Sequence, residues 1–463
     1  MRCDSLTATT TANEASHEFG KGTMNLEIGQ NSSEDTPEFL VLNWRHEIYS
    51  TFVKAKKHAT YVLDRHALYT EFESAVRECQ RLGVSYIVVE NLDNVGTIYA
   101  LVSLLLENRG SYRAVFSCDE KTQYAAAIIS QEVFCDYEAA KRALYTKDKR
   151  WMKNLLRDTV RMADHFSVAT HARHGRIDSL PKGFDFPIVI KPVNRYGSYA
   201  TYLVEDIETL NERLKQFKDN LAEFICEEFI SGAEYNVDVI WKNGDPLYFF
   251  VGEYIVPRLY GYENRISKIT TYLPRDKHSP LYDRFYEEMR AIGRKLDIKD
   301  GVTHAEFFIN SEDTVLGEIA TRHAGGGMSY CIQAVLGEGL IELGLRTRLG
   351  YLEGAPAQKA ILGDYIGFID LRPHKSGVVV AVISEDELAV VPGVIRLIYR
   401  VRMNHHIEAF GRDSWCVLAI VNAPTRDLLH ARMQELQGRF WCRFKDDDSI
   451  DSARLDLQMK ELR

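Results

Sequence analysis

Residues 301–322 alternate between apolar and polar side chains on both sides of a short polar turn, which is typical of a β-hairpin. With a turn over 310–314, Ile309 faces Val315, and the same register places Glu306 directly opposite Glu318. One face is then apolar and carries Ala305, Phe307, Ile309, Val315 and Ile319. The other face is polar and carries His304, Glu306, Glu318 and Arg322. The segment therefore predicts two strands of a sheet that packs on a core through one face.

The two glutamates constrain what the polar face can do. Cross-strand partners have Cβ atoms about 5 Å apart, and like charges there are destabilising. A hard divalent cation between the carboxylates would remove that repulsion. The alternative is a solvent-exposed face on which the two side chains diverge into water. We predict a metal site with Glu306 and Glu318 as ligands.

Composition excludes several classes of protein. The chain has 463 residues, enough for two or three domains, and a net charge of -9 argues against a general nucleic-acid or anionic-membrane surface. No apolar run approaches the roughly 18 residues that a membrane span needs. The eight cysteines are scattered without a Cys-x-x-Cys spacing, as in reduced cytosolic proteins. We expect a cytoplasmic protein with no nucleic-acid partner and no membrane partner.

The pattern along the chain divides it into four sections. Residues 1–38 are polar and aperiodic, which predicts a disordered tail, and Met24 within it is an alternative start. Residues 39–135 alternate between strand and helix, which indicates an open parallel α/β sheet. No Gly-x-Gly-x-x-Gly follows its first strand, so we expect no dinucleotide site there. Residues 136–349 form a larger section that ends with the hairpin and a helix, and 350–463 form a small α+β lobe.

Short apolar runs mark the expected strands, which are 39–42, 59–63, 85–89, 112–116, 187–191, 199–204, 224–230, 235–240, 247–251, 378–383, 395–402 and 416–421. Longer periodic stretches mark the expected helices, which include 69–82, 94–106, 146–156, 206–217 and 425–437.

A buried strand ends at Lys191 and is followed by a loop with Gly197 and Ser198. A lysine beside free backbone N–H groups suits the oxygens of a polyphosphate, and a glycine permits close backbone approach. The alternative is a surface lysine before an ordinary turn. The segment predicts a phosphate-binding loop.

Two further segments carry charged groups near strand ends. Residues 226–240 contain a strand, a turn and a second strand from Glu234; their carboxylates could hold an adenine amino group and ribose hydroxyls, or be solvated at a sheet edge. Arg322 follows Glu318 by four residues and could neutralise a phosphate or bind a carboxylate bidentately. The glycines at 325–327 lead into a helix whose N-terminus also favours anions.

In this order, the lysine strand, the Gly/Ser loop, the acidic edge and the His-x-Glu…Glu-x-x-x-Arg hairpin resemble the ATP-grasp superfamily. The resemblance covers residues 136–345 closely. Segments 318–322 and 363–368 and the C-terminal lobe are most similar to the L-amino acid ligases, which make dipeptides. The resemblance implies an α/β and α+β chain with a preATP-grasp α/β domain over 39–135, an ATP-grasp domain over 136–349 and a C-terminal lobe over 350–463.

The resemblance also implies roles for individual residues. The ATP-contacting residues it implies are the phosphate-binding Lys149 and Lys191, the loop residues Gly197 and Ser198, the adenine hinge Glu227, Glu228, Phe229 and Ile230, and the ribose-binding Glu234. Glu306 and Glu318 match the Mg²⁺ ligands, with Mn²⁺ as an alternative metal. Arg322 matches the catalytic arginine that steadies an acyl phosphate or a substrate carboxylate.

The chain departs from the superfamily pattern at three places. Ala320 stands where many members have a third metal ligand, and Ala200 stands where the phosphate loop often has a second glycine. Residues 270–274, compared with a histidine-bearing loop of dipeptide-forming relatives, contain no histidine. A tyrosine-rich loop over 258–265 is expected to line the substrate side, with Arg258 and Arg265 as candidates for binding the acid.

The activity implied is that of an ATP-dependent ligase, which activates a carboxylate as an acyl phosphate and joins it to an amine, releasing ADP and phosphate. The alternatives are a carboxylase, a phosphotransferase or a non-catalytic ATP-binding protein on the same scaffold. The chain has no biotin-attachment Met-Lys-Met. The expected partners are a small-molecule acid and amine, and a homodimer is the expected assembly because dimers are common on related scaffolds.

Overall fold

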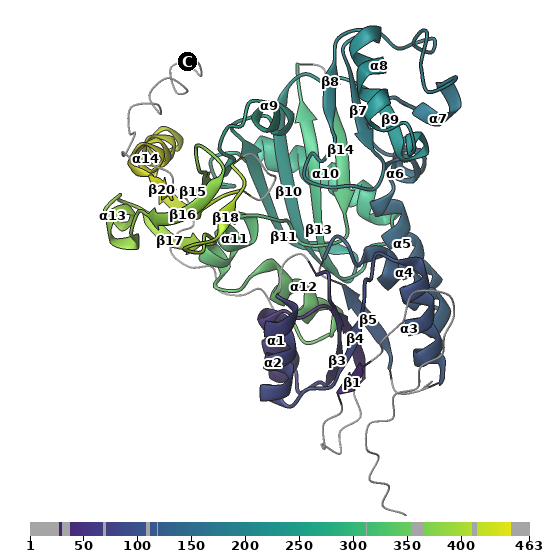
Figure 1. The fold of residues 1–463 in the computed structure, drawn as a ribbon, viewed down its shortest axis with the longest axis vertical. Helices are drawn as coiled ribbons and strands as arrows, with labels where there is room; N and C mark the ends of the chain where they lie inside the picture. The colour runs from purple at the N-terminus through teal and green to yellow at the C-terminus, as the bar shows by residue number, and fades with distance from the viewer. Residues whose placement is uncertain are drawn as a thin grey trace, which may run out of the picture.

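The computed structural model describes residues 27–29, 38–67, 71–107, 112–117, 119–311, 313–352, 364–409 and 414–445. The described strands form four sheets, of which the largest has eight strands. In Figure 1 the N-terminal sheet lies at the bottom, the eight-stranded sheet in the middle, and the C-terminal strands at the left.

The N-terminal section contains an open sheet in which four strands pair in parallel, in the order β4-β3-β2-β5. A fifth strand, β1, lies at the β4 edge. The four parallel strands are β2 (Phe39–Leu42), β3 (Ala59–Asp64), β4 (Tyr86–Val89) and β5 (Ala114–Ser117). Nearly all of their residues are buried, as expected for a parallel sheet covered on both faces. The covering helices are α1 (His46–Lys54), α2 (Phe72–Leu82), α3 (Val95–Glu107) and α4 (Gln123–Phe134). The predicted parallel α/β sheet is confirmed.

The prediction of a tail without structure is wrong for three residues. β1 (Glu27–Gly29) pairs antiparallel with β4. An edge strand presents unpaired N–H and C=O groups, and a short passing segment can pair with them whatever its side chains. The rest of the predicted tail, 1–26 and 30–37, lies outside the described residues.

The next section begins with two helices and a small sheet. A single helix predicted over 146–156 is in fact two, α5 (Tyr137–Lys147) and α6 (Lys149–Leu156). Asp148 separates them, because its carboxylate accepts the Arg150 N–H at 2.9 Å and caps α6. The small sheet has the order β6-β9-β7-β8 and is covered by α8 (Ile207–Gln216); its strands are β6 (His165–Ser167), β7 (Ile188–Pro192), β8 (Tyr202–Val204) and β9 (Phe224–Glu228).

The eight-stranded sheet is antiparallel and has the order β14-β13-β10-β11-β12-β15-β19-β17. Its first five strands are β10 (Ala233–Lys242), β11 (Asp245–Tyr254), β12 (Ile269–Tyr272), β13 (Gly301–Ile309) and β14 (Thr314–Ala320). The others, β15 (Tyr365–Leu371), β17 (Val394–Tyr399) and β19 (Val417–Ala423), belong to the predicted C-terminal lobe. The lobe therefore continues the central sheet, while the domain boundaries remain a prediction.

Two segments predicted as loops are regular elements. Residues 269–272, in the stretch compared with a histidine-bearing loop, form β12, and residues 258–263 form the short helix α9. Thr270 and Thr271 are fully buried between β11 and β15. β-branched residues suit such a strand, but the run is too short to be distinguished from a loop in sequence.

Two apolar layers hold the large sheet. One face packs on α10 (Ser279–Lys295), where Trp241, Phe285 and Phe307 are buried. The other face packs on α11 (Met328–Leu336) and α12 (Leu340–Arg348). α12 also contributes Ile341 and Leu345 to the core against α1, so it joins the N-terminal sheet to the large sheet.

The remaining C-terminal elements are β16 (Gly377–Val382), β18 (His406–Ile407), β20 (Cys442–Phe444), α13 (Glu385–Ala389) and α14 (Arg426–Arg439). Within the described residues, no helix is long and apolar enough to cross a membrane.

Candidate active site

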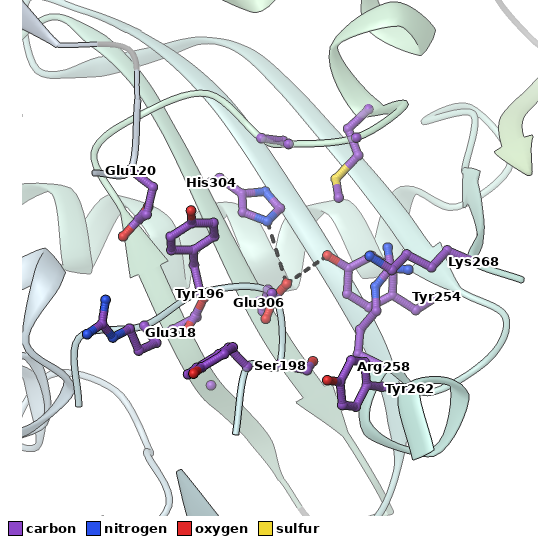
Figure 2. Close-up of a pocket in the computed structure, with 18 of the residues that line it drawn as sticks. Glu120, Tyr196, Ser198, Tyr254, Arg258, Tyr262, Lys268, His304, Glu306 and Glu318 are labelled. Atoms are coloured by element: carbon purple, nitrogen blue, oxygen red, sulfur yellow. Dashed lines mark hydrogen bonds and ion pairs between the residues drawn. The ribbon is translucent and has the colours of Figure 1, made fainter. Parts of the chain in front are cut away.

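A cavity of about 1190 Å³ opens where the N-terminal sheet, the four-stranded sheet and the large sheet meet. Its lining includes every predicted site residue: Lys149, Lys191, Gly197, Ser198, Glu227, Glu228, Phe229, Ile230, Glu234, Glu306, Glu318 and Arg322. These residues are up to about 170 positions apart in the chain, so the fold brings them together. Figure 2 shows Glu120, Tyr196 and Glu318 on one side of this pocket, and Tyr254, Arg258 and Lys268 on the other.

The hairpin places Glu306 opposite Glu318, as its alternation predicts, but the register near the turn differs. Phe308 pairs with Val315, so the predicted Ile309–Val315 pair is wrong. The register shifts between Glu306 and Phe307, which leaves Gly317 as an extra residue in β14. Such a bulge reverses the faces beyond it.

The bulge also corrects the predicted apolar face. Val315 lines the cavity beside Phe308 instead of the core, and Leu316 is packed in the core. A Cβ at Gly317 would lie 3.0 Å from Phe308 Cε2 and 3.3 Å from the Glu306 carbonyl, so glycine suits this position. The single glycine in the strand was the available signal.

Glu306 is held as a carboxylate by two neighbours. The Tyr254 hydroxyl donates to Glu306 Oε1 at 2.9 Å, and His304 Nε2 lies 3.7 Å from the same oxygen (Figure 2). Burial alone would raise the pKa of Glu306, but the bonds and charge supplied mainly by His304 lower it to about 2. A carboxylate that stays charged in a buried site suits a cation.

Behind His304 lies a buried polar network that the sequence analysis missed. His304 Nδ1 is 2.9 Å from Asp238 Oδ1, and the Tyr272 hydroxyl donates to Asp238 Oδ2 at 2.6 Å. Burial opposes a charged imidazole, but Asp238 raises the pKa of His304 to about 9. The signal was present: Glu234, Asn236 and Asp238 place polar groups at every second position of one strand.

The predicted phosphate lysines both contact carboxylates. Lys149 Nζ lies 3.2 Å from Glu318 Oε2 and donates to the Arg195 carbonyl at 2.8 Å. Burial would lower the pKa of Lys149, but Glu318 raises it overall. Lys191 Nζ lies 2.6 Å from Glu227 Oε2. Both lysines therefore lie at the cavity wall beside a carboxylate.

Lys153, one turn after Lys149 on α6, is a third buried lysine here, with Nζ 3.2 Å from Glu227 Oε1. The carboxylate of Glu227 therefore faces two lysines. Any contact of residues 227–230 with adenine would therefore be made by groups of this predicted hinge other than the Glu227 carboxylate. Glu228 accepts the Asp164 N–H at 3.2 Å, and the Phe229 side chain is exposed.

The predicted phosphate loop adopts a left-handed backbone at three positions. The φ angles are 61° at Gly197, 58° at Ser198 and 49° at Ala200. A non-glycine residue rarely adopts this region. Ala200 thus takes the conformation that a second glycine would take, and the loop keeps its turn despite that departure from the superfamily pattern.

Glu234 and Arg258 meet at the next strand pair. Glu234 Oε2 accepts the Arg258 backbone N–H at 2.7 Å, and burial together with Glu306 raises the pKa of Glu234 to about 8. The Arg258 guanidinium lies 3.6 Å from the Tyr254 ring centre and donates to Thr270 Oγ1 at 3.0 Å. Arg265, the other predicted acid-binding arginine, is not among the residues that line the cavity.

Arg322 contacts a residue that the sequence analysis missed. Its Nε donates to the Glu120 carboxylate, and Lys147 Nζ lies 2.6 Å from Glu120 Oε1. Burial would raise the pKa of Glu120, but Arg322 and Lys147 lower it to about 2. Glu120 follows β5, and ligands of open parallel sheets bind at the carboxyl ends of strands, a rule that could have found it.

Comparison with known proteins agrees with this geometry. A family model described as an ATP-grasp domain matches residues 184–330. The chain contains an ATP-grasp domain. The chain is 26% identical over 255 residues to the L-arginine-specific L-amino acid ligase of Bacillus subtilis, covering 52% of this chain and 59% of that relative. The match thus spans less than two thirds of the relative's length, and it confirms the predicted similarity to L-amino acid ligases.

Solved structures support the same fold. An L-amino acid ligase from Bacillus licheniformis gives a TM-score of 0.66 at 14% identity, covering 89% of this chain and 100% of that chain. A carboxyaminoimidazole ribonucleotide synthase from Aspergillus clavatus, complexed with ATP, gives 0.63 at 16% identity, covering 87% and 98%. The predicted fold class is confirmed.

The ATP-grasp fold implies a divalent metal, and the oxygen donors at the hairpin fit one. Glu306 and Glu318 are cross-strand partners in the cavity wall. In the part of the chain that the structure describes, no group of three or more His, Cys, Asp or Glu side chains is arranged to hold a metal. Mg²⁺ in nucleotide sites is usually held by one or two carboxylates, with phosphates and water completing its shell. Two carboxylates match that pattern.

Proposed function

We propose that this chain is an ATP-dependent carboxylate–amine ligase that activates an acid, of the amino-acid class, as an acyl phosphate and joins it to an amine. The observation that carries the proposal is the convergence of Lys149, Lys191, Glu306, Glu318 and Arg322 on one cavity. The Bacillus subtilis relative is named as an L-amino acid ligase, which supports the amino-acid class.

The proposed reaction has two transfers. A carboxylate oxygen of the acid attacks the γ-phosphorus of ATP, the bond to the β–γ bridging oxygen breaks, and ADP leaves. The amine nitrogen then attacks the acyl carbon, phosphate leaves, and the nitrogen loses a proton to give the amide. Bound Mg²⁺, held by Glu306 and Glu318, would neutralise charge on the β- and γ-phosphates.

The protein's own contribution is position and charge. Lys149 and Lys191, which pair with Glu318 and Glu227, would bind phosphate oxygens as charge moves from the γ-phosphoryl group to ADP. The loop at Gly197 and Ser198 would cover the triphosphate. Glu234 would bind the ribose. Exclusion of water matters because a solvated acyl phosphate would hydrolyse.

Arg322 would steady the acyl phosphate or the substrate carboxylate. It reaches the cavity wall from the end of β14, next to Glu318. A guanidinium suits either anion because it donates in a planar fork.

The wider context belongs to the same proposal. The partners are a small-molecule acid and amine, the assembly is a homodimer, and the compartment is the cytoplasm. We also propose the division into domains at residues 38/39, 135/136 and 349/350. Mn²⁺ is the proposed substitute for Mg²⁺.

A phosphate-release screen over pairs of amino acids tests the activity. A ligase releases phosphate and ADP only when ATP, an acid and an amine are all present, and mass spectrometry then identifies the amide. Phosphate release with bicarbonate in place of the pair of amino acids indicates a carboxylase. Nucleotide binding without turnover of any pair would overturn the proposal in favour of a non-catalytic ATP-binding protein.

A further inference from the structure

The loop after β5 brings a carboxylate of the N-terminal sheet into the cavity. Glu120 lines the cavity together with Arg322, although they are 202 residues apart. We infer that Glu120 is a positioning residue, which holds the guanidinium of Arg322 in the orientation that the ligation needs. This inference rests on the proposed function for the role of Arg322.

The contact is buried and has three members. The side chains of Glu120 and Arg322 are 11% and 13% exposed, and that of Lys147 is 7% exposed. Arg322 Nε donates to Glu120 Oε2, while Lys147 Nζ donates to Glu120 Oε1 at 2.6 Å and to the Glu120 carbonyl at 3.1 Å. The carboxylate is thus fixed by Lys147 from one side and is available to fix Arg322 from the other.

Arg322 needs a partner because its backbone position does not orient its side chain. β14 ends at Ala320, and Arg322 lies in the bend that follows. An arginine side chain held only at its backbone end can adopt many rotamers. Its Nη1 donates to the His323 carbonyl at 2.8 Å, and its Nε donates to Glu120. Two bonds at different nitrogens set the plane of the guanidinium.

The charges leave the cluster suited to an anion. Arg322 and Lys147 are cationic and Glu120 is anionic, so the cluster carries one net positive charge. Replacing Glu120 by glutamine would keep the shape and raise that charge. A fall in activity on this substitution would therefore come from lost orientation, because the added positive charge would favour an anionic substrate.

The positioning also makes the N-terminal section part of the site. Glu120 lies in the loop after β5 of the parallel sheet, whereas Lys147 ends α5 and Arg322 follows β14. Thr146 Oγ1, at the same junction, lies 3.1 Å from Thr321 Oγ1. The orientation of Arg322 therefore depends on how these three parts of the fold meet.

The kinetic test compares Glu120→Gln with wild type under ligation conditions. We expect kcat to fall on the order of 100-fold, as when a reacting group is misplaced by about 1 Å, with KM for ATP changed by less than about threefold. Glu120→Gln added to Arg322→Lys should cause no further fall in kcat, because both act through one group. Glu338→Gln is the matched control: the same substitution removes a carboxylate that pairs with Arg346 outside the cavity lining, and it should keep kcat within about threefold of wild type.

A full kcat in Glu120→Gln, or an additive loss with Arg322→Lys, would overturn the inference. Glu120→Asp keeps the charge, and its kcat should lie above that of Glu120→Gln; an equal or lower kcat would count against positioning by the carboxylate. A double-mutant cycle in urea unfolding between Glu120→Gln and Arg322→Met measures the coupling of these two side chains without catalysis, and an absent coupling would also overturn the inference. If the wild-type protein ligated no pair of substrates, only the proposed function would be contradicted, because the double-mutant cycle would still measure the contact between Glu120 and Arg322.

Discussion

Lys149 Nζ lies 3.2 Å from Glu318 Oε2, so a predicted phosphate-binding lysine forms an ion pair with a predicted metal ligand. The pair therefore sets a lysine beside a carboxylate before nucleotide enters. Divalent metal and a phosphate oxygen would supply both with new partners of opposite charge, at the same place. The two side chains thus already lie where metal and phosphate would bind.

Glu318→Ala should abolish turnover while leaving the fold intact. The reason is that Glu318 is one of only two carboxylates proposed to hold the metal, and the loss also leaves Lys149 without its partner. We expect kcat to fall at least on the order of 100-fold, with an unchanged circular dichroism spectrum. Glu338→Gln, which removes a carboxylate paired with Arg346 outside the cavity, is the control. Retained full activity in Glu318→Ala would refute the metal assignment.

Arg258→Gln should raise KM for one of the two substrates by at least about tenfold and leave KM for ATP unchanged. The guanidinium lies over Tyr254 and binds Thr270, which are cross-strand partners on β11 and β12. Thr270 lies on β12, three strands from β13 in the sheet order, and the contact with Glu234 is made by the Arg258 backbone N–H, which glutamine keeps. The guanidinium would then bind a carboxylate bidentately.

Arg265 supplies the control for this prediction. It belongs to the same segment but is not a lining residue, so Arg265→Gln should leave both substrate KM values unchanged. Initial rates at varied acid, amine and ATP distinguish the outcomes. A rise in KM for ATP in Arg258→Gln would assign Arg258 to the nucleotide instead.

Gly293→Ala should destabilise the protein by about 1–3 kcal/mol, although alanine is the better helix former. A Cβ at this position of α10 would lie 2.4 Å from Trp241 Cη2, and Trp241 is fully buried, so it has little room to move. Gly438→Ala in α14 meets nothing within 4 Å and should stabilise by about 0.5–1 kcal/mol. Urea unfolding of both variants tests the pair. Equal effects would mean that the contact with Trp241 does not decide the outcome.

The stability that Glu120 contributes should depend on pH. Its pKa is lowered from 4.5 to about 2 in the folded protein, so its contribution is fully present above 4.5 and is lost as the pH falls toward 2. The shift corresponds to at most about 3 kcal/mol. In urea unfolding, the difference between wild type and Glu120→Gln should therefore be constant above pH 5 and shrink below 4.5. A difference that stays constant down to pH 3.5 would contradict the pairing with Arg322 and Lys147.

Local sequence patterns decided much of this protein. Alternation over 301–322 predicted the hairpin and the pairing of Glu306 with Glu318, although that pairing also depends on the bulge at Gly317. The strand and helix alternation over 39–135 indicated a parallel sheet, and the ordered motifs indicated the ATP-grasp fold. Every site residue predicted from these motifs lines the cavity, although their roles remain predictions.

The tertiary structure decided what depends on distant contacts. The bulge at Gly317 sends Val315 to the cavity, because register near the turn depends on packing against Phe308. Asp238 contacts His304 only because β10 and β13 are neighbours in the sheet. Glu120 meets Arg322 across 202 residues because two sheets dock through α12. Periodicity indicates which face of a strand or helix a residue occupies, but not which distant residue will lie against it. The contacts between distant residues set the charge and orientation of the groups in this cavity.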